Sequence, residues 1–267
     1  MYELYWGLKE KPFENTPDPR FLYLSDEHQE AISRLTYAIE QRKGAALLTG
    51  GYGCGKTVIS RVILGKLTPD KYESALVTNP LLSPIDLLRE ICFQLDVKIE
   101  LESSKTELLQ KLNECFYKNM NAKKDTVIII DEAQAITSLS AFEELRLLLN
   151  FQLNDRFLLT LILIGQPELK EKINQLKQFK QRLAIQCHLV PLNEQETAQY
   201  ILHRLEIAEA QSEIFAPEAM QTVWKRSNGI PRVINNICDL SLMIGFSKKV
   251  HKIDGALIQS VANELDP

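Results

Sequence analysis

The stretch AALLTGGYGCGKT, residues 45–57, decides the fold. Residues 45–49 are apolar and suit a buried strand, and a helical pattern begins at Lys56. Between them lies a glycine-rich turn, so the segment has the strand, turn and helix order of a phosphate-binding loop. The residues that match GxxxxGK[ST] are Gly50, Gly51, Tyr52, Gly53, Cys54, Gly55, Lys56 and Thr57.

The chemistry of phosphate binding explains this spacing. Glycines let backbone N–H groups curve around a phosphate without obstruction by Cβ atoms, and the following helix presents its positive N-terminal end. We expect Lys56 to contact the β- and γ-phosphates of a nucleotide and the Thr57 hydroxyl to coordinate Mg²⁺.

Cys54 lies inside this loop and has two interpretations. In the first it is a small filler that points away from the nucleotide. In the second it is an oxidation-sensitive thiol, because a helix N-terminus lowers the pKa of a nearby thiol.

Outward from the loop, short apolar runs alternate with helical patterns. Two of the runs, TVIII and LLTLILI, are continuously apolar, as in parallel strands covered on both faces. The alternation predicts an α/β fold with a doubly wound parallel sheet. The strands are expected at 45–49, 74–78, 126–130, 158–164 and 184–189, and the helices at 26–41, 56–67, 85–95, 106–121 and 139–152. Ser104 and Glu107 have the spacing of a capping box.

After Pro191 the pattern becomes entirely helical. We expect helices at 194–208, 217–226, 231–246 and 254–264, with prolines at helix starts. The sequence therefore predicts a lead-in segment at 1–43, an α/β core at 44–192 and a small all-helical lid domain at 193–267.

Acidic residues follow the third expected strand. Asp131 and Glu132 come directly after TVIII, and the carboxyl end of a buried parallel strand faces the ligand crevice. We expect Asp131 to hold Mg²⁺ and Glu132 to polarise the attacking water. Gln166 follows the next strand, where it is placed to sense the γ-phosphate or orient that water.

Composition narrows the class of protein. The 267 residues are 45% hydrophobic and 25% charged, which is typical of a globular chain rather than a disordered one. A net charge of -4 indicates no general attraction to nucleic acid. The five cysteines form no CxxC pair, so a disulfide framework or a zinc site is not expected. We see no signal peptide or membrane span and expect a cytoplasmic protein.

The sequence resembles the AAA+ ATPases of the general secretion pathway protein A (ExeA) type, which are related to transposition ATPases of the TniB/TnsC kind. The segments that carry the resemblance are YWGLKEKPF, PDPRFLYLS, GGYGCGKT, VIIIDEAQ, EELRLLLNFQ, LIGQPEL, QRLAIQCHLVPL and NGIPRVINNICD. The resemblance implies a P-loop NTPase core with a five-stranded sheet in the order 5-1-4-3-2, followed by the lid. It also implies that Gln166 is the sensor-1 residue, that Arg182 acts in trans on a neighbouring subunit's γ-phosphate, and that Arg232 is the sensor-2 arginine.

We therefore expect an ATPase that uses ATP and Mg²⁺ and works as a homo-oligomeric ring or filament. Its nucleotide state would remodel or recruit a protein partner, in secretion or envelope assembly. ExeA-type proteins that work at the cell wall carry a membrane span and a peptidoglycan-binding region beyond the ATPase. We expect neither in this chain, and therefore no direct role in secretin insertion. One alternative is an ATP-dependent regulator of transposition that binds duplex DNA, and another is a nucleotide-gated binding module without turnover.

Overall fold

The computed structural model describes residues 1–265, so the last two residues of the expected lid domain lie outside the described part. The residues form two compact units. The helical unit comprises Met1–Asp26, Gly51–Val58 and the chain from Val190 onward, and the sheet unit comprises Glu27–Gly50 and Ile59–Leu189. The domain boundaries expected at 43/44 and 192/193 remain predictions.

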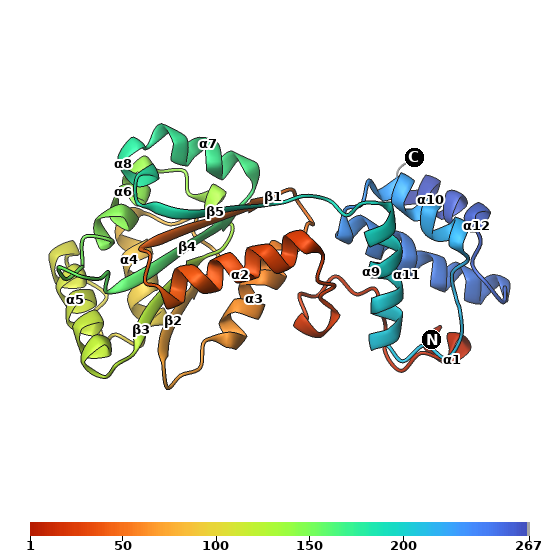
Figure 1. Ribbon diagram of the computed structural model, residues 1–267, viewed down its shortest axis with the longest axis horizontal. Helices are drawn as coiled ribbons and strands as arrows, with labels where there is room; N and C mark the ends of the chain where they lie inside the picture. Colours follow the sequence, from red (N-terminus) through yellow and green to blue (C-terminus); the bar gives the residue numbers. More distant parts are fainter. Residues whose placement is uncertain (266–267) are drawn as a thin grey trace. The chain divides into compact units, whose positions relative to one another are not determined.

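The sheet unit is built on five parallel strands in the order β2-β3-β4-β1-β5 (Figure 1). This is the expected order 5-1-4-3-2 seen from the other edge, so that prediction is confirmed. The strands are β1 (Ala45–Gly50), β2 (Tyr72–Val77), β3 (Asp125–Ile130), β4 (Leu159–Gly165) and β5 (Leu183–Leu189).

Burial along the strands follows their places in the sheet. Every residue of β4 is buried, and so is every residue of β3 after the first, as their continuously apolar sequences predict for strands covered on both faces. The central strand β1 is buried throughout as well. The edge strand β5 alternates between half-buried and exposed residues up to its final leucine. The register pairs Thr49 of β1 with Gly165 of β4, so the carboxyl ends of these central strands lie side by side.

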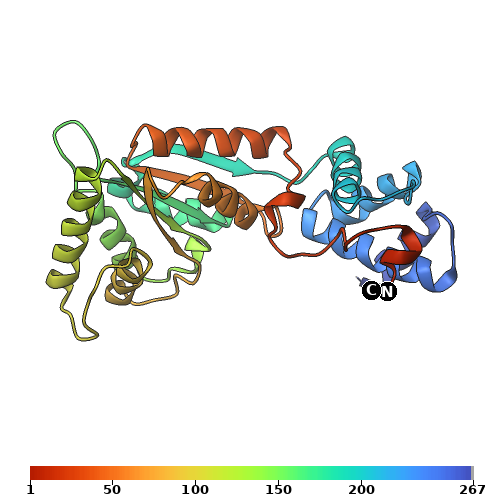
Figure 2. The same cartoon turned by 90° about the horizontal axis from the view of Figure 1, so that it is seen from below.

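Helices cover both faces of the sheet (Figures 1 and 2). The hydrophobic core on one face joins alternate residues of the strands to α4 (Pro84–Gln94), α5 (Lys105–Asn121), α6 (Leu139–Leu148), α7 (Pro167–Gln175) and α8 (Lys177–Lys180). The helices α2 (Asp26–Glu40) and α3 (Lys56–Lys66) lie on the other face. The capping box predicted at α5 is present, with Ser104 and Glu107 bonded reciprocally.

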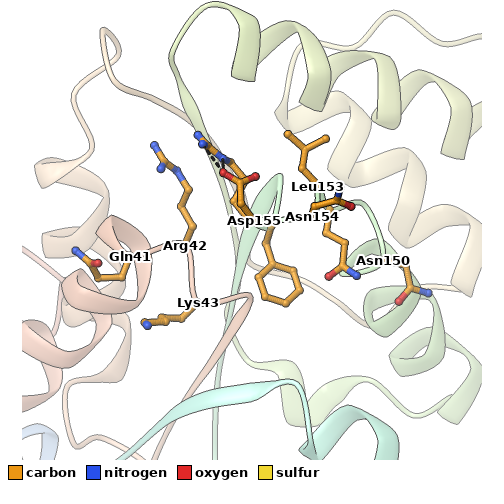
Figure 3. Close-up of a pocket in the computed structure, with 10 residues that line it drawn as sticks. Gln41, Arg42, Lys43, Asn150, Leu153, Asn154 and Asp155 are labelled. Carbon is orange, nitrogen blue, oxygen red and sulfur yellow. Dashed lines mark hydrogen bonds and ion pairs between the residues drawn. The ribbon is translucent and has the colours of Figure 1, made fainter.

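Around β4, one expected helix ends early and one helix was not predicted. The helix expected at 139–152 ends at Leu148, because Gln152 forms an antiparallel bridge with Phe157 that turns the chain back toward β4. After β4, a helix α7 begins with Pro167 in its first turn, where no helix was predicted. The connection from α6 to β4 is thus a loop of its own, and its residues line a polar pocket of about 800 Å³ (Figure 3).

The helical unit consists of α9 (Glu194–Ile207), α10 (Pro217–Ser227), α11 (Pro231–Lys248) and α12 (Gly255–Leu265), together with the N-terminal segment. That segment contains α1 (Glu3–Trp6) and the 3-10 helix η1 (Pro19–Phe21), neither of which was predicted. Trp6 is buried and its indole N–H donates to the carbonyl of Leu242 at 2.9 Å. The buried Arg204 donates to the carbonyls of Pro12 (2.5 Å) and Glu14 (2.9 Å), which attaches the segment to α9.

Candidate nucleotide site

The phosphate-loop candidate lies between the end of β1 at Gly50 and the start of α3 at Lys56. Gly53 and Gly55 have φ values of 78° and 89°, a left-handed backbone that glycine adopts without steric cost. Lys56 is buried, and its Nζ donates to the carbonyl oxygen of Gly51 at 2.9 Å. The ammonium group is therefore held over the loop whose backbone is expected to surround a phosphate.

The environment of Cys54 distinguishes its two interpretations. The side chain is 1% exposed, and its Sγ lies close to where a side chain on Gly51 would begin. Burial raises the pKa of the thiol, and the nearby Lys56 offsets this only in part. A buried thiol with a raised pKa is a poor nucleophile, so the structure favours Cys54 as a filler of the loop.

Within the helical unit, Arg232 lies against the phosphate-loop candidate. Its guanidinium stacks over the exposed ring of Tyr52 at 4.3 Å from the centroid, and its backbone N–H donates to the carbonyl of Gly53 at 3.4 Å. A Cβ on Gly53 would come within 2.8 Å of the Cβ of Arg232, so the glycine also permits this close approach. The first turn of α11 thus brings a cation to the loop, at the residue that the family resemblance implies.

In the sheet unit, Asp131 and Glu132 follow the carboxyl end of β3, as predicted. Asp131 is buried, and its Oδ1 accepts the backbone N–H of Glu132 at 2.8 Å. Glu132 has a φ of 51°, in the left-handed region that non-glycine residues rarely adopt. A backbone of this kind costs about 1–3 kcal/mol in a non-glycine residue, and here it turns the chain sharply after the strand.

Gln134 connects the acidic pair to the end of β4, a role that the sequence did not reveal. Its Nε2 donates to Oε2 of Glu132 at 2.5 Å, and its Oε1 accepts the backbone N–H of Gln166 at 3.0 Å. Lys172 of α7 fixes the turn by donating to the carbonyls of Gln134 (2.6 Å) and Ile136 (2.9 Å). A Cβ at position 165 would lie 2.5 Å from Oε1 of Gln134, which explains the glycine there.

We expect the variant Gln134→Ala to lower the rate of ATP hydrolysis by about tenfold, because a hydrogen bond to a charged group contributes roughly 1.5–3 kcal/mol. Nucleotide affinity is expected to stay within about twofold, since Gln134 acts through Glu132. Steady-state phosphate release and nucleotide titration measure the two effects. The control is Gln94→Ala, which removes a glutamine that donates to Glu90 at 2.8 Å on α4. An unchanged or raised hydrolysis rate in Gln134→Ala would assign no positioning role to this amide.

Arg182 lies at the opposite end of the parallel strands from Asp131 and Gln166. It immediately precedes β5, whereas Asp131 and Gln166 follow the carboxyl ends of β3 and β4. Its Nη2 donates to Oδ1 of Asn150 at 3.1 Å, and its guanidinium lies 6.0 Å from the ring centroid of Phe157. The sheet unit therefore does not bring Arg182 to its own acidic pair, and the role of Arg182 toward a neighbouring copy stays a prediction.

The predicted metal ligands are oxygen atoms, of the Thr57 hydroxyl and the Asp131 carboxylate. Such hard ligands suit Mg²⁺, which binds proteins through one or two such groups together with substrate phosphates and water. Residues 1–265 contain no group of three or more histidine, cysteine or acidic side chains suited to hold a metal ion by themselves.

Comparison with known proteins agrees with this geometry. A family model described as "AAA domain" matches residues 39–173, half of the chain. The chain belongs to this family of AAA domains. The match includes the phosphate loop, the acidic pair and Gln166.

Among curated proteins, the general secretion pathway protein A of Aeromonas hydrophila is 39% identical over 267 residues. The alignment covers 99% of this chain and 48% of that protein, so this AAA domain spans about half the length of its relative. The resemblance to ExeA-type proteins is thereby confirmed.

Solved structures share the fold at low sequence identity. The Aeropyrum pernix ORC2 protein in its ADPNP-ADP complexes matches with a TM-score of 0.72 and 15% identity, over 96% of this chain and 72% of that chain. The Drosophila ORC bound to DNA matches with a TM-score of 0.74 and 19% identity, over 96% and 64% of the two chains. These likenesses show a shared fold, and the family match identifies it as that of an AAA domain. Among residues 1–265, no helix combines the length and apolar character needed to cross a membrane.

Proposed function

We propose that this AAA domain binds ATP with Mg²⁺, hydrolyses it, and couples its nucleotide state to self-assembly and to the remodelling or recruitment of a protein partner. The observation that best supports hydrolysis is the position of the Glu132 carboxylate. It follows the buried Asp131 in a left-handed turn and accepts a hydrogen bond from Gln134. A protein that only binds nucleotide needs no positioned carboxylate of this kind.

Each predicted residue has a separate part in the proposed reaction. The backbone of residues 50–55 and Lys56 bind the phosphates. Thr57 and Asp131 would supply oxygen ligands to Mg²⁺, which when bound would offset negative charge on the phosphate oxygens. Glu132 accepts a proton from the attacking water, and Gln166 orients that water. Arg232 stabilises charge on the phosphates, and Arg182 does the same for the nucleotide of a neighbouring copy.

The variant Lys56→Ala is expected to weaken ATP binding by at least about tenfold, because it removes a charge-assisted contact to phosphate. Lys66→Ala is the matched control, since Lys66 is an exposed lysine in the last turn of the same helix. Binding is measured by titration with a fluorescent ATP analogue, and far-UV circular dichroism checks that both variants fold. Equal affinity in Lys56→Ala and Lys66→Ala would contradict the assignment of the phosphate loop.

For the partner, the similarity to general secretion pathway protein A favours a protein component of a secretion or envelope apparatus. Affinity capture with the variant Glu132→Gln and ATP, followed by identification of retained protein and nucleic acid, tests this choice. The proposal expects a protein partner that is released when ADP replaces ATP. Retention of duplex DNA alone, with a steep dependence on salt, would instead indicate the transposition-type function.

Phosphate release by the purified wild-type protein tests turnover itself. We expect a rate per chain that rises with protein concentration, because Arg182 is proposed to act on a neighbouring copy. ATP binding without phosphate release at any protein concentration would indicate a nucleotide-gated binding module rather than an ATPase.

A further inference from the structure

The guanidinium of Arg232 lies over the ring of Tyr52, and both residues belong to the helical unit. Its Cζ atom is 4.3 Å from the ring centroid, the shortest distance between a cation and an aromatic ring within residues 1–265. The next shortest, from Arg204 to Phe21, is 4.9 Å. The proposed reaction gives a part to the backbone of residue 52 but none to its ring.

The phosphate-loop pattern does not specify the residue at position 52. GxxxxGK[ST] leaves this place open, and the Tyr52 side chain is 66% exposed. An aromatic ring in this environment adds little to a hydrophobic core, because the stabilisation comes from apolar area removed from water. Within the described part of the chain, the one charged or aromatic group in contact with the ring is Arg232. The contact with Arg232 therefore best explains an aromatic residue in the loop.

The first turn of α11 is attached to the same loop through its backbone. The N-cap residue Ile230 provides no side-chain hydrogen bond, so the N–H groups at the start of the helix need other acceptors. The carbonyl of Gly53 accepts one of them, from Arg232 at 3.4 Å. The backbone of Arg232 is thus placed at residue 53, and its side chain at residue 52.

The guanidinium of Arg232 keeps its hydrogen-bond donors unused. Among residues 1–265 it forms no hydrogen bond and no ion pair. The rotamer freedom of an arginine side chain opposes any single orientation, and contact with a ring restricts that freedom. A guanidinium can lie over an aromatic face and still donate N–H groups to phosphate oxygens, because these groups lie in its own plane. Tyr52 therefore holds a cation with available donors beside the loop that is expected to bind phosphate.

We infer that Tyr52 is a positioning residue for Arg232. Its ring holds the guanidinium at the phosphate loop, so that the cation is in place when the phosphates of ATP bind. The ring contacts Arg232 and not the nucleotide. The inference rests on the nucleotide binding and the part of Arg232 that are proposed above, but not on turnover.

Removal of the ring is expected to weaken nucleotide binding moderately. We expect Tyr52→Ala to lower the affinity for a non-hydrolysable ATP analogue by about two- to fivefold, the equivalent of about 0.5–1 kcal/mol for an exposed cation–π contact. Hydrolysis of ATP should fall by at least the same factor, because Arg232 is proposed to stabilise charge on the phosphates. The matched control is Tyr37→Ala on α2. Tyr37 is 49% exposed and its ring centroid lies 5.6 Å from Nζ of Lys43, so this variant should bind and hydrolyse ATP like the wild type.

A series of substitutions separates the cation–π contact from the bulk of the side chain. Tyr52→Phe and Tyr52→Trp keep an aromatic face and should retain the affinity of the wild type within about twofold. Tyr52→Leu keeps apolar bulk without an aromatic face and should resemble Tyr52→Ala. Far-UV circular dichroism checks that each variant folds. Wild-type affinity in Tyr52→Ala or Tyr52→Leu would overturn the inference, and so would a loss in Tyr52→Phe, which would assign the effect to the hydroxyl group.

A double-mutant cycle tests whether Tyr52 acts through Arg232. The substitution Tyr52→Ala is made in the wild type and in Arg232→Ala, and the affinity for the analogue is measured in all four proteins. In the Arg232→Ala background it should leave the affinity unchanged. An equal loss in both backgrounds would overturn the inference in favour of direct contact between Tyr52 and the nucleotide. A higher affinity in Tyr52→Ala than in the wild type would also overturn it, since the ring would then compete with phosphate for Arg232.

Competition by inorganic tripolyphosphate identifies the part of the ligand that responds. Because Arg232 is proposed to act on the phosphates, Tyr52→Ala should weaken the binding of tripolyphosphate by the same factor as that of the analogue. A loss confined to the analogue would indicate stacking of Tyr52 on the base and would overturn the inference.

The affinity measurements do not require hydrolysis, so they separate this inference from the proposed ATPase function. The expected affinities, together with no phosphate release by the wild type, would contradict the ATPase function and leave the role of Tyr52 standing. Phosphate release by the wild type with equal affinities in Tyr52→Ala and the wild type would do the reverse. Failure of the wild type to bind the analogue would overturn both.

Discussion

Replacement of Glu132 by glutamine is expected to lower ATP hydrolysis by about 100-fold or more while ATP binding stays within about twofold of wild type. The carboxylate is the group proposed to take a proton from the attacking water, and an amide cannot accept that proton. The substitution preserves side-chain size, and the amide oxygen can still accept the hydrogen bond from Gln134. The variant is therefore expected to hold ATP without turning it over.

Single-turnover phosphate release and nucleotide titration measure the two halves of this prediction. The matched control is Glu90→Gln, because Glu90 also accepts a glutamine amide, from Gln94 at 2.8 Å, but lies on α4. It should hydrolyse ATP like the wild type. Continued turnover in Glu132→Gln would remove Glu132 from the role of general base, and loss of ATP binding would mean that Glu132 supports the fold of the site instead.

The sheet is the part of the fold that the sequence predicted best. Continuously apolar runs such as TVIII and LLTLILI have few other ways to be buried, and all five expected strands are present with ends shifted by one or two residues. The strand order came from the family resemblance rather than from periodicity, because the apolar pattern of a strand does not identify its neighbours. The structure has this order.

The short helices and the connections were predicted less well, for physical reasons. The four residues of α1 are too few to show a helical period, and what secures them is distant packing, such as Trp6 against α11. The early end of α6 depends on the bridge between Gln152 and Phe157, which a local leucine pattern cannot anticipate. Tertiary contacts determine both features.

The residues of the candidate site also fall into two groups, those that local sequence predicts and those that depend on tertiary contacts. The phosphate loop and the acidic pair were predictable, because glycine spacing and the ends of buried strands have direct chemical consequences. Gln134 was not, since its bonds to Glu132 and Gln166 depend on the left-handed turn at Glu132. Stacking of Arg232 on Tyr52 joins residues 180 positions apart (232 − 52), which spacing alone does not reveal.

Replacement of Gly229 by alanine is expected to give the largest loss of stability in the helical unit, about 3 kcal/mol or more. Gly229 has a φ of 72°, a backbone that costs an L-residue roughly 1–2 kcal/mol. A Cβ there would lie 1.8 Å from the carbonyl oxygen of Leu192, so the added methyl group also requires the chain to move, at a further cost of about 1–3 kcal/mol. The movement would break the hydrogen bond from the N–H of Leu192 to the carbonyl of Gly229, now 2.9 Å long.

Urea unfolding followed by circular dichroism measures this loss, and Gly65→Ala is the matched control. Gly65 lies in α3 with no atom within 4 Å of the position of an added Cβ, so alanine there should stabilise the helix by up to about 1 kcal/mol. The variant Gly229→Ala should also weaken ATP binding, because Gly229 is three residues before Arg232, whose N–H meets the carbonyl of Gly53. A free energy of unfolding within about 0.5 kcal/mol of the wild-type value would show that the backbone around Leu192 moves away from the added Cβ at little energetic cost. The turn before α11 would then not be what holds Arg232 against the phosphate loop.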